Sequence, residues 1–279
     1  MDVLNQPLVS IVCLTYNHEA YIRECLDGFV MQQTNFPIEI IVHDDASTDS
    51  TATIVKEYEE KYPHLFNNVY RTENWYSQGK DIWGYLFTQK AQGKYIALCE
   101  GDDYWTDPLK LQKQVDFLEK NPEYSFCCAR FRKYKQEKDI FEKEYAFDYY
   151  LENQNLEITE KLFFKIWVTQ PLTVLYQKDL YIEIQKYLKR YKYTRDVHLF
   201  YHLLKIGNGI SLNRCVGIYR LHEGGIAGCR SNVERYKESV KIYWDLLKYN
   251  LGDIHLWRIL SHCMFGYLYF KCNYKIYKS

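Results

Sequence analysis

Two adjacent carboxylates stand out in the sequence Cys99-Glu100-Gly101-Asp102-Asp103-Tyr104-Trp105. They follow an apolar run, 95–98, that is typical of a buried strand. In α/β proteins, ligands bind at the carboxyl ends of strands. Neighbouring aspartates repel each other unless a cation lies close by, and Mg²⁺ or Mn²⁺ accepts oxygen ligands and shares them with phosphates. The alternative is an acidic turn that caps the helix beginning near Pro108.

A second acidic pair, Asp44 and Asp45, follows the apolar run 38–42. A carboxylate here can accept a hydrogen bond from a nucleotide base, and the next helix offers free backbone N–H groups. The sequence contains neither a G-x-G-x-x-G after the first strand nor a Walker lysine loop. It therefore excludes the usual dinucleotide and P-loop phosphate sites.

The first predicted strand, 9–14, ends in Thr15-Tyr16-Asn17-His18. An aromatic ring beside polar side chains suits a pyrimidine ring better than a pyrophosphate. The alternative is structural, with Tyr16 packed in the core and Asn17 capping the next helix.

The second half contributes Asp196 and His222. Asp196 begins a predicted helix, where it is either a functional acid or a plain N-cap. His222 follows a predicted strand and precedes a glycine-rich turn, so it is either a ligand or a structural hydrogen-bonding group. His198 and His202 have the i, i+4 spacing that could chelate zinc. They lack the glutamate of the H-E-x-x-H hydrolases, so we interpret them as ordinary surface or acceptor-side histidines.

Hydrophobic periodicity in the first half alternates between strand and helix. This order predicts an α/β fold with a doubly wound, mostly parallel sheet flanked by helices. The predicted strands are 9–14, 38–42, 68–71 and 95–98, and the predicted helices are 21–31, 47–62, 82–91 and 108–119.

The second half is less regular, and its segment 133–157 reads as a loop. Its predicted strands are 125–132, 173–176 and 216–221, and its predicted helices are 179–188, 196–206, one beginning near 231 and one at 254–270. We expect a catalytic domain over 1–230, with a nucleotide-binding half (1–122) and an acceptor-side half (123–230), and a C-terminal helical extension over 231–279.

Composition narrows the function classes. Lys plus Arg total 36 and Asp plus Glu total 36, so no overall charge attracts a nucleic acid. The 9 Cys include no Cys-x-x-Cys pair, which favours reduced thiols in a cytosolic setting. The N-terminus has no secretion signal pattern, and no apolar run is long enough to cross a bilayer. We expect a cytoplasmic protein, either free or peripheral at the inner face of the cell membrane.

Three segments in this order, 9–17, 41–49 and 93–103, resemble the family-two nucleotide-sugar glycosyltransferases. The second half resembles them more loosely, through Asp196 and Tyr219-Arg220-Leu221-His222. The resemblance implies the A-type glycosyltransferase fold. It also implies an inverting, metal-dependent, non-processive transfer of a hexosyl group from a nucleotide donor, UDP being favoured. The implied acceptor is a glycan or lipid-linked glycan, in bacterial surface polysaccharide synthesis.

The resemblance also implies residue roles. Asp196 is the catalytic base, and Asp103 and His222 bind Mn²⁺ or Mg²⁺. The nucleotide contacts are Thr15, Tyr16, Asn17, Asp44, Asp45, Asp102 and Arg220. Among them, Asp45 accepts the uracil N3–H with Asp44 beside it, and Arg220 lies near the phosphate charge. Apart from the resemblance, Trp105 directly follows the acidic motif, so it either stacks on a donor or acceptor sugar or packs in the core.

Two rival functions stay open. A sugar nucleotidyltransferase would need a basic, glycine-rich N-terminal loop, which is missing. A non-catalytic nucleotide-sugar or glycan-binding protein on the same fold is the stronger alternative. The apolar, aromatic segment 254–270, followed by lysines, either lies in a membrane interface or packs on the core or a second copy of the chain.

Overall fold

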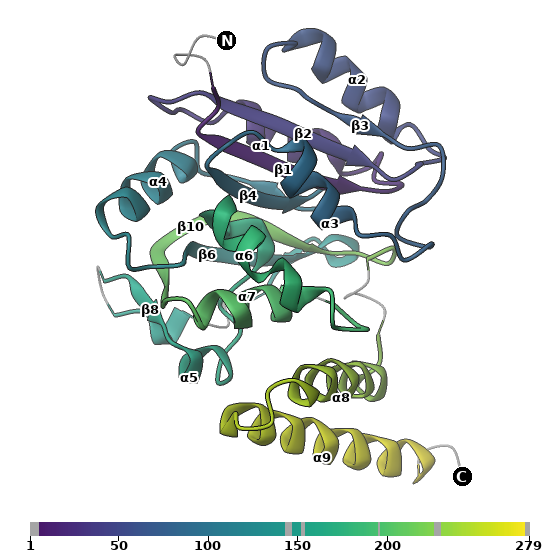
Figure 1. The fold of residues 1–279 in the computed structure, drawn as a ribbon. Helices are drawn as coiled ribbons and strands as arrows, with labels where there is room; N and C mark the ends of the chain where they lie inside the picture. Colours follow the sequence, from purple (N-terminus) through teal and green to yellow (C-terminus); the bar gives the residue numbers. More distant parts are fainter. Residues whose placement is uncertain (1–5, 143–146, 152–153, 195, 226–229, 277–279) are drawn as a thin grey trace.

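The structure is a computed structural model that describes residues 6–142, 147–151, 154–194, 196–225 and 230–276. One mixed sheet runs through the described part of the chain in the order β3-β2-β1-β4-β9-β6-β10-β5 (Figure 1). Its central strands are continuous apolar runs because helices cover both faces of the sheet.

Three neighbouring parallel strands build the edge that matters for function. They are β1 (Val9–Thr15), β2 (Ile38–Asp44) and β4 (Tyr95–Glu100), and β1 pairs with both of the others. Thr15 lies opposite Asp44, and Leu14 lies opposite Glu100. The carboxyl ends of the three strands therefore meet, as the sequence predicts.

The second half departs from a parallel sheet. β9 (Leu175–Gln177) runs antiparallel to both β4 and β6 (Phe126–Lys135), whereas β10 (Gly209–Leu221) runs parallel to β6. The short β5 (Tyr104–Trp105) pairs antiparallel with β10. The expectation of a mostly parallel sheet thus holds for the first half alone, because the chain inserts β9 between β4 and β6 from the opposite direction.

The segment 133–157, predicted as a loop, is partly strand. β6 extends to Lys135 and pairs with β7 (Ile140–Phe141), and β8 (Leu156–Ile158) pairs with β10. Charged and aromatic residues at the surface hid this pairing, since one face of each strand is solvated.

Each face of the sheet has its own apolar core. The helices α1, α2 and α4 pack on one face, and α3, α5, α6, α7 and the start of α9 pack on the other. Their bounds are α1 Ile22–Val30, α2 Thr51–Lys61, α3 Ile82–Tyr85 (continued by a π-helical turn, Leu86–Lys90), α4 Lys110–Lys120, α5 Glu160–Phe163, α6 Lys178–Leu188 and α7 Asp196–Leu204.

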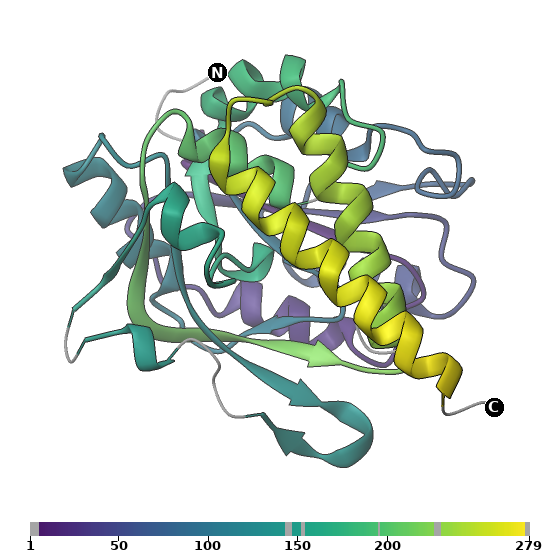
Figure 2. The same ribbon diagram turned by 90° about the horizontal axis from the view of Figure 1, so that it is seen from below.

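The C-terminal part is a helical hairpin of α8 (Asn232–Lys248) and α9 (Ile254–Ile276). It lies at one end of the molecule, and α9 is its outermost layer (Figure 2). Ser231 and Glu234 form a capping box at the start of α8. None of the helices formed by the described residues has the length and apolar character needed to span a bilayer. The division of the chain at residue 230 stays a prediction.

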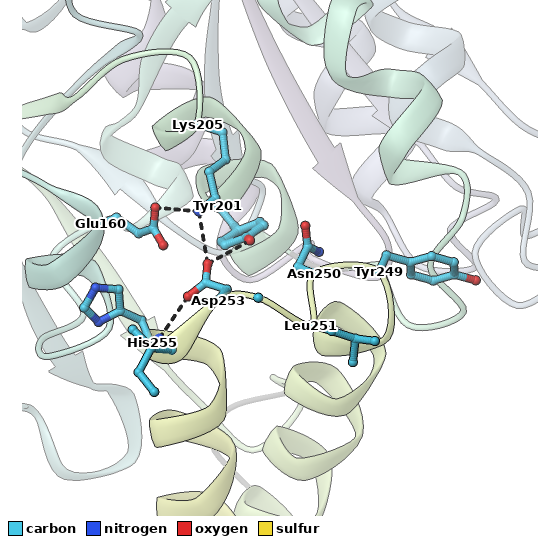
Figure 3. Close-up of a pocket in the computed structure, with 10 residues that line it drawn as sticks. Glu160, Tyr201, Lys205, Tyr249, Asn250, Leu251, Asp253 and His255 are labelled. Atoms are coloured by element: carbon cyan, nitrogen blue, oxygen red, sulfur yellow. Dashed lines mark hydrogen bonds and ion pairs between the residues drawn. The ribbon is translucent and has the colours of Figure 1, made fainter.

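A polar joint ties the start of α9 to the rest of the protein at the rim of a pocket of about 560 Å³ (Figure 3). Lys205 Nζ donates to Glu160 Oε2 at 2.6 Å and to Asp253 Oδ2 at 3.0 Å, and Tyr201 OH donates to the same Asp253 oxygen at 2.9 Å. Burial would raise the pKa of Asp253, but these partners outweigh it and lower the pKa to about 2. The polar groups of this pocket thus hold one another and fix the hairpin.

Candidate active site at the carboxyl ends of β1, β2 and β4

Thr15 and Asp44 form the first wall of the site. They are neighbours across β1 and β2, and Thr15 Oγ1 and Asp44 Oδ1 are buried with no hydrogen-bond partner. Asp44 Oδ2 accepts from the Ser47 backbone N–H at 3.2 Å. Burial raises the pKa of Asp44 above its usual range. Buried polar groups without partners are uncommon, and here one hydroxyl group and one carboxylate oxygen have none.

Asp45 has a different task from its neighbour. Its two carboxylate oxygens accept the backbone N–H groups of Trp75 and Tyr76, at 2.7 and 2.9 Å, and its own carbonyl accepts from the Asn74 side chain. This carboxylate therefore orders the loop after β3 (Val69–Tyr70). The resemblance assigns the base contact to Asp45, whereas the contacts leave the free oxygen on Asp44.

Asn17 is likewise committed to loop structure. Its side-chain oxygen accepts from the Thr48 backbone N–H at 2.8 Å, and its own N–H donates to Ser47 Oγ at 2.9 Å. Asn17 adopts a left-handed φ of 55°, which asparagine tolerates well. It therefore joins the loops that follow β1 and β2. Tyr16 beside it is 45% exposed, so its ring is available at the mouth of the site.

Asp102 lies between two imidazoles. His222 Nε2 is 3.0 Å from Asp102 Oδ2, and His18 Nε2 is 4.0 Å from the same oxygen. Burial would raise the pKa of Asp102, but the His222 hydrogen bond and the nearby histidine charges lower it overall. Asp102 Oδ1 and His18 Nδ1 are buried without partners.

Gly101 allows the ends of β1 and β4 to approach each other closely. A Cβ added at Gly101 would lie 2.7 Å from Thr15 Oγ1 and 2.9 Å from His18 Nδ1. These distances are shorter than ordinary Cβ contacts, so a side chain at Gly101 would clash with both atoms, which lack hydrogen-bond partners. The glycine thus brings the two strand ends together around buried polar atoms.

Asp103 is held by β10. Its Oδ1 accepts the backbone N–H of Arg220 at 2.8 Å, the residue is 3% exposed, and burial raises its pKa well above the usual range. The Arg220 guanidinium donates to the Asp102 carbonyl at 2.8 Å, to Glu24 at 2.5 Å and to Gln136. The guanidinium predicted to contact phosphate thus already has protein partners on all three nitrogens, and it joins β10 to α1.

Asp196 begins α7 and interacts electrostatically with groups at the end of β4 and on β10. Its charge, with that of Asp102, adds to the desolvation that raises the pKa of Glu100 to about 8. It also contributes to the raised pKa of Tyr219 on β10, after burial and the nearer acids. Asp196 Oδ1 accepts the Val197 N–H at 2.9 Å. The predicted base therefore lies near the end of β4. Arg195, which precedes it, is outside the described residues.

Asp245 on α8 is a site residue that sequence reasoning missed. Its buried Oδ2 accepts the backbone N–H groups of Lys192 and Tyr193, at 2.6 and 3.0 Å. These residues lead directly into Asp196. The C-terminal hairpin thus fixes the loop before the predicted base, and no local sequence pattern around Asp245 signals this.

Trp105 has the core role, which is one of the two roles that the sequence leaves open. The residue is 2% exposed, its Nε1 donates to the Leu172 carbonyl at 2.7 Å, and its ring packs edge-on against Phe29 at 4.8 Å between centroids. A ring enclosed in this way cannot stack on a sugar. The prediction of a sugar contact at Trp105 is wrong, because this residue points into the core from β5.

His198 and His202 are not surface residues either. They are 0% and 7% exposed, and His202 Nε2 lies 2.8 Å from Tyr191 OH while its ring stacks on Tyr187. The interpretation as surface histidines is therefore wrong, and the acceptor-side interpretation stays a prediction. The helix α7 is buried on all sides, which the i, i+4 spacing alone could not indicate.

A divalent cation fits the site in a sparse form. Among the described residues, no three His, Cys, Asp or Glu side chains converge to hold a metal. Cations in nucleotide sites usually take one or two protein carboxylates and complete their shell with phosphate oxygens and water. Asp102, with its unpartnered Oδ1, and the adjacent His222 suit such a site. Asp103 suits it less, since one of its oxygens is already bonded to Arg220.

Comparison with known proteins agrees with this geometry. A family model described as glycosyl transferase family 2 matches residues 10–185, which include the ends of β1, β2 and β4. An uncharacterised protein of Mycobacterium tuberculosis strain H37Rv is 52% identical over 121 residues. That match is 43% of this chain and 34% of the mycobacterial protein, so the alignment spans about a third of that relative.

A second relative is TuaG of Bacillus subtilis strain 168, which is described as a putative glycosyltransferase of teichuronic acid biosynthesis. It is 29% identical over 224 residues, which are 80% of this chain and 82% of TuaG. The shared length therefore extends well past the segment matched by the family model.

Solved structures share the fold. Staphylococcus aureus TarS 1–349 in complex with UDP-GlcNAc superposes with a TM-score of 0.67 at 21% identity, over 94% of this chain and 73% of the TarS chain. The mannosyltransferase PcManGT of Pyrobaculum calidifontis, in complex with GDP-Man and Mn²⁺, gives a TM-score of 0.60 at 17% identity, over 93% and 69%. The predicted A-type fold is confirmed by the TarS likeness.

Proposed function

The chain belongs to glycosyltransferase family 2, and we propose from this membership that it transfers a hexosyl group from a UDP-sugar to a hydroxyl group of a glycan or lipid-linked glycan. The observation that carries the proposal is the set of buried polar atoms without partners at the ends of three adjacent strands. These atoms are Thr15 Oγ1, His18 Nδ1, Asp44 Oδ1 and Asp102 Oδ1.

The uridine would bind at the ends of β1 and β2. Asp44 Oδ1 can accept a base N–H, Thr15 Oγ1 can donate or accept, and the exposed Tyr16 ring can stack on the base. We assign the base contact to Asp44 rather than Asp45, because both Asp45 oxygens are bonded to the loop at Trp75 and Tyr76. A pyrimidine therefore has its polar partners on one side and a ring face on the other.

The diphosphate would bind at the end of β4. Asp102 and His222 would hold Mn²⁺ or Mg²⁺, which would supply positive charge to the leaving diphosphate. Within the chain itself, His18 lies beside Asp102, and its Nδ1 can donate to a phosphate oxygen in the tautomer that carries the proton on Nδ1. Asp103 positions the turn through its hydrogen bond with Arg220.

Asp196 would act as the base. The acceptor hydroxyl oxygen forms a bond to the anomeric carbon, the bond from that carbon to the diphosphate breaks, and the hydroxyl proton passes to the Asp196 carboxylate. One displacement at one carbon inverts its configuration. Proton removal by a positioned carboxylate contributes on the order of 10²- to 10⁴-fold to the rate.

The setting proposed is bacterial surface polysaccharide synthesis. The name of TuaG supports this for a relative that shares most of its length with this chain. The sequence has no Gln-x-x-Arg-Trp motif, which favours a single transfer per acceptor over processive synthesis.

A donor screen tests the proposal. The full chain is incubated with Mn²⁺, a panel of UDP-hexoses and UDP-N-acetylhexosamines, and glycan or lipid-linked acceptors, and UDP release is measured beside the Asp196→Asn variant. We expect acceptor-dependent release by the wild type alone. UDP binding by calorimetry without turnover of any donor would favour the non-catalytic binding protein, and absence of UDP binding would refute both readings.

A further inference from the structure

The helix α9 is apolar around its whole circumference, but protein covers only one side of it. Leu256, Leu260 and Cys263 are buried against the rest of the chain. Gly266 lies so close to α8 that an added Cβ would be 2.4 Å from the Tyr236 ring. A helix that is hydrophobic all round is normally buried all round. Something else must therefore cover the opposite side.

The uncovered side is here called the outer face of α9, and the exposed polar residues Arg258, Ser261 and His262 separate its apolar residues into two groups along the helix. At 3.6 residues per turn its members fall within less than half of the helix circumference. Their exposed fractions run from 44% to 71%, and the members are Ile254, Trp257, Met264, Phe265, Leu268 and Tyr269. Figure 2 shows that no other element lies in front of α9 on this side. Exposed apolar surface of this kind marks an interaction site.

The charge on this segment selects the kind of partner. Residues 254–279 contain no Asp or Glu, and they contain Arg258, Lys271, Lys275 and Lys278. Arg258 and Lys271 are exposed beside the outer face. Two copies meeting through this face would bring like charges together, which opposes a symmetric dimer. An apolar and aromatic stripe bordered by basic residues matches an anionic lipid surface.

We propose that the outer face of α9 docks on an anionic bilayer, with the helix lying in the plane of the interface. Trp257 and Tyr269 have amphipathic rings that suit the headgroup level, and Phe265 and Leu268 reach the acyl boundary. The surface belongs to a different part of the chain from the cleft, so the inference stands independently of the proposed transfer reaction. It would place the cleft beside lipid-linked acceptors.

Vesicle co-sedimentation of the full chain tests the inference. The probes are vesicles of phosphatidylcholine alone and vesicles with one third phosphatidylglycerol. We expect binding to the anionic vesicles, at least tenfold weaker binding to the neutral ones, and loss of binding in high salt. The double variant Phe265→Glu, Leu268→Glu should lower anionic vesicle binding at least tenfold. Ile182→Glu is the matched control, because Ile182 is an exposed apolar residue of α6 (48% exposed) and should change nothing.

Two further measurements separate the outcomes. Trp257→Phe should remove part of the fluorescence quenching by brominated lipids, which reports the helix itself. UDP calorimetry on each variant shows whether the fold and the cleft survive. Unchanged vesicle binding by the double variant overturns the inference. So does a dimer in light scattering that the double variant converts to monomer without any lipid binding by the wild type, since a second copy then covers the face.

Discussion

The imidazole Nε2 of His222 lies 3.0 Å from Oδ2 of Asp102, and this contact joins residues 120 positions apart. It brings the end of β10 onto the turn after β4. With the Arg220–Asp103 hydrogen bond two residues earlier, it makes the second half of the chain part of the candidate site. The site thus requires both halves of the sheet.

We expect His222→Ala to abolish the Mn²⁺-dependent part of UDP binding. The variant loses one side chain of the sparse cation site and leaves Asp102 with a single imidazole neighbour. Calorimetry with Mn²⁺ and with EDTA should show wild-type affinity falling at least tenfold on chelation, and the variant unchanged by chelation. The exposed His64→Ala serves as the control. A variant that still responds fully to Mn²⁺ would remove His222 from the cation site.

Replacing Asp196 by asparagine should separate binding from chemistry. The shape is preserved, so UDP affinity should stay within about twofold of the wild type, while turnover should fall on the order of 10²- to 10⁴-fold because the proton acceptor is gone. Single-turnover rates and UDP calorimetry on the same preparation check this. Turnover near the wild-type rate would exclude Asp196 as the base and direct attention to Glu100, which lies close to it.

Asp245 should act as a positioning residue for the loop before Asp196. Asp245→Ala leaves the Lys192 and Tyr193 N–H groups without their acceptor, so kcat should fall more than tenfold with little change in the KM for the UDP-sugar. In Asp245→Asn the amide oxygen can still accept both N–H groups, and we expect most of kcat to return. Equal kcat in the two variants would mean that the contact only stabilises the fold.

Asp44 and Asp45 should respond in opposite ways to removal. Asp45→Ala leaves the Trp75 and Tyr76 N–H groups without an acceptor and should cost about 2–3 kcal/mol of unfolding free energy. Asp44→Ala removes a buried carboxylate with one unpartnered oxygen, so stability should hold or rise while UDP affinity falls at least tenfold. Urea unfolding and calorimetry on both variants decide. Loss of UDP affinity only in folded Asp45→Ala would restore the original assignment.

Stability should fall in mild acid because of buried histidine. Burial lowers the pKa of His202 to about 4, from an ordinary value of 6.5. Below pH 6.5 the unfolded chain binds a proton at His202, whereas the folded chain keeps His202 neutral until the pH approaches 4. The contribution of His202 to the free energy of unfolding is therefore fully present above pH 6.5 and is lost between pH 6.5 and 4. His202→Gln, which keeps a polar partner for Tyr191, should flatten the decline by on the order of 2 kcal/mol. Urea midpoints across this range are measured for the wild type, for His202→Gln and for the control His64→Gln. A parallel decline in all three would mean that His202 does not cause the loss of stability.

The sequence predicts the first half of the fold well, for a physical reason. The strands β1, β2 and β4 are apolar on both faces, so each appears in the sequence as a continuous hydrophobic run. β10 begins seven residues before its predicted start, because Asn213 and Arg214 interrupt its apolar pattern. The local pattern could not indicate that β6 supplies backbone partners both before and after this irregularity.

The candidate site shows the same limit at the level of single residues. Asp44 and Asp45 both follow β2, and only the backbone of a loop 30 residues away distinguishes them. Trp105 follows the acidic motif, yet successive residues of a strand point to opposite faces, and this one points inward. Two side chains that are adjacent in sequence thus have different roles, because each contacts a distant segment that the local pattern does not reveal.

The helix α8 contacts both the segment before Asp196 and the helix α9. Asp245 near its end holds the approach to Asp196, and Tyr236 near its start receives α9 at Gly266. Attachment of the hairpin to a surface would therefore act on the same helix that holds the residues before Asp196. An enzyme built in this way is expected to show interfacial activation, with turnover of a soluble acceptor rising when vesicles are added.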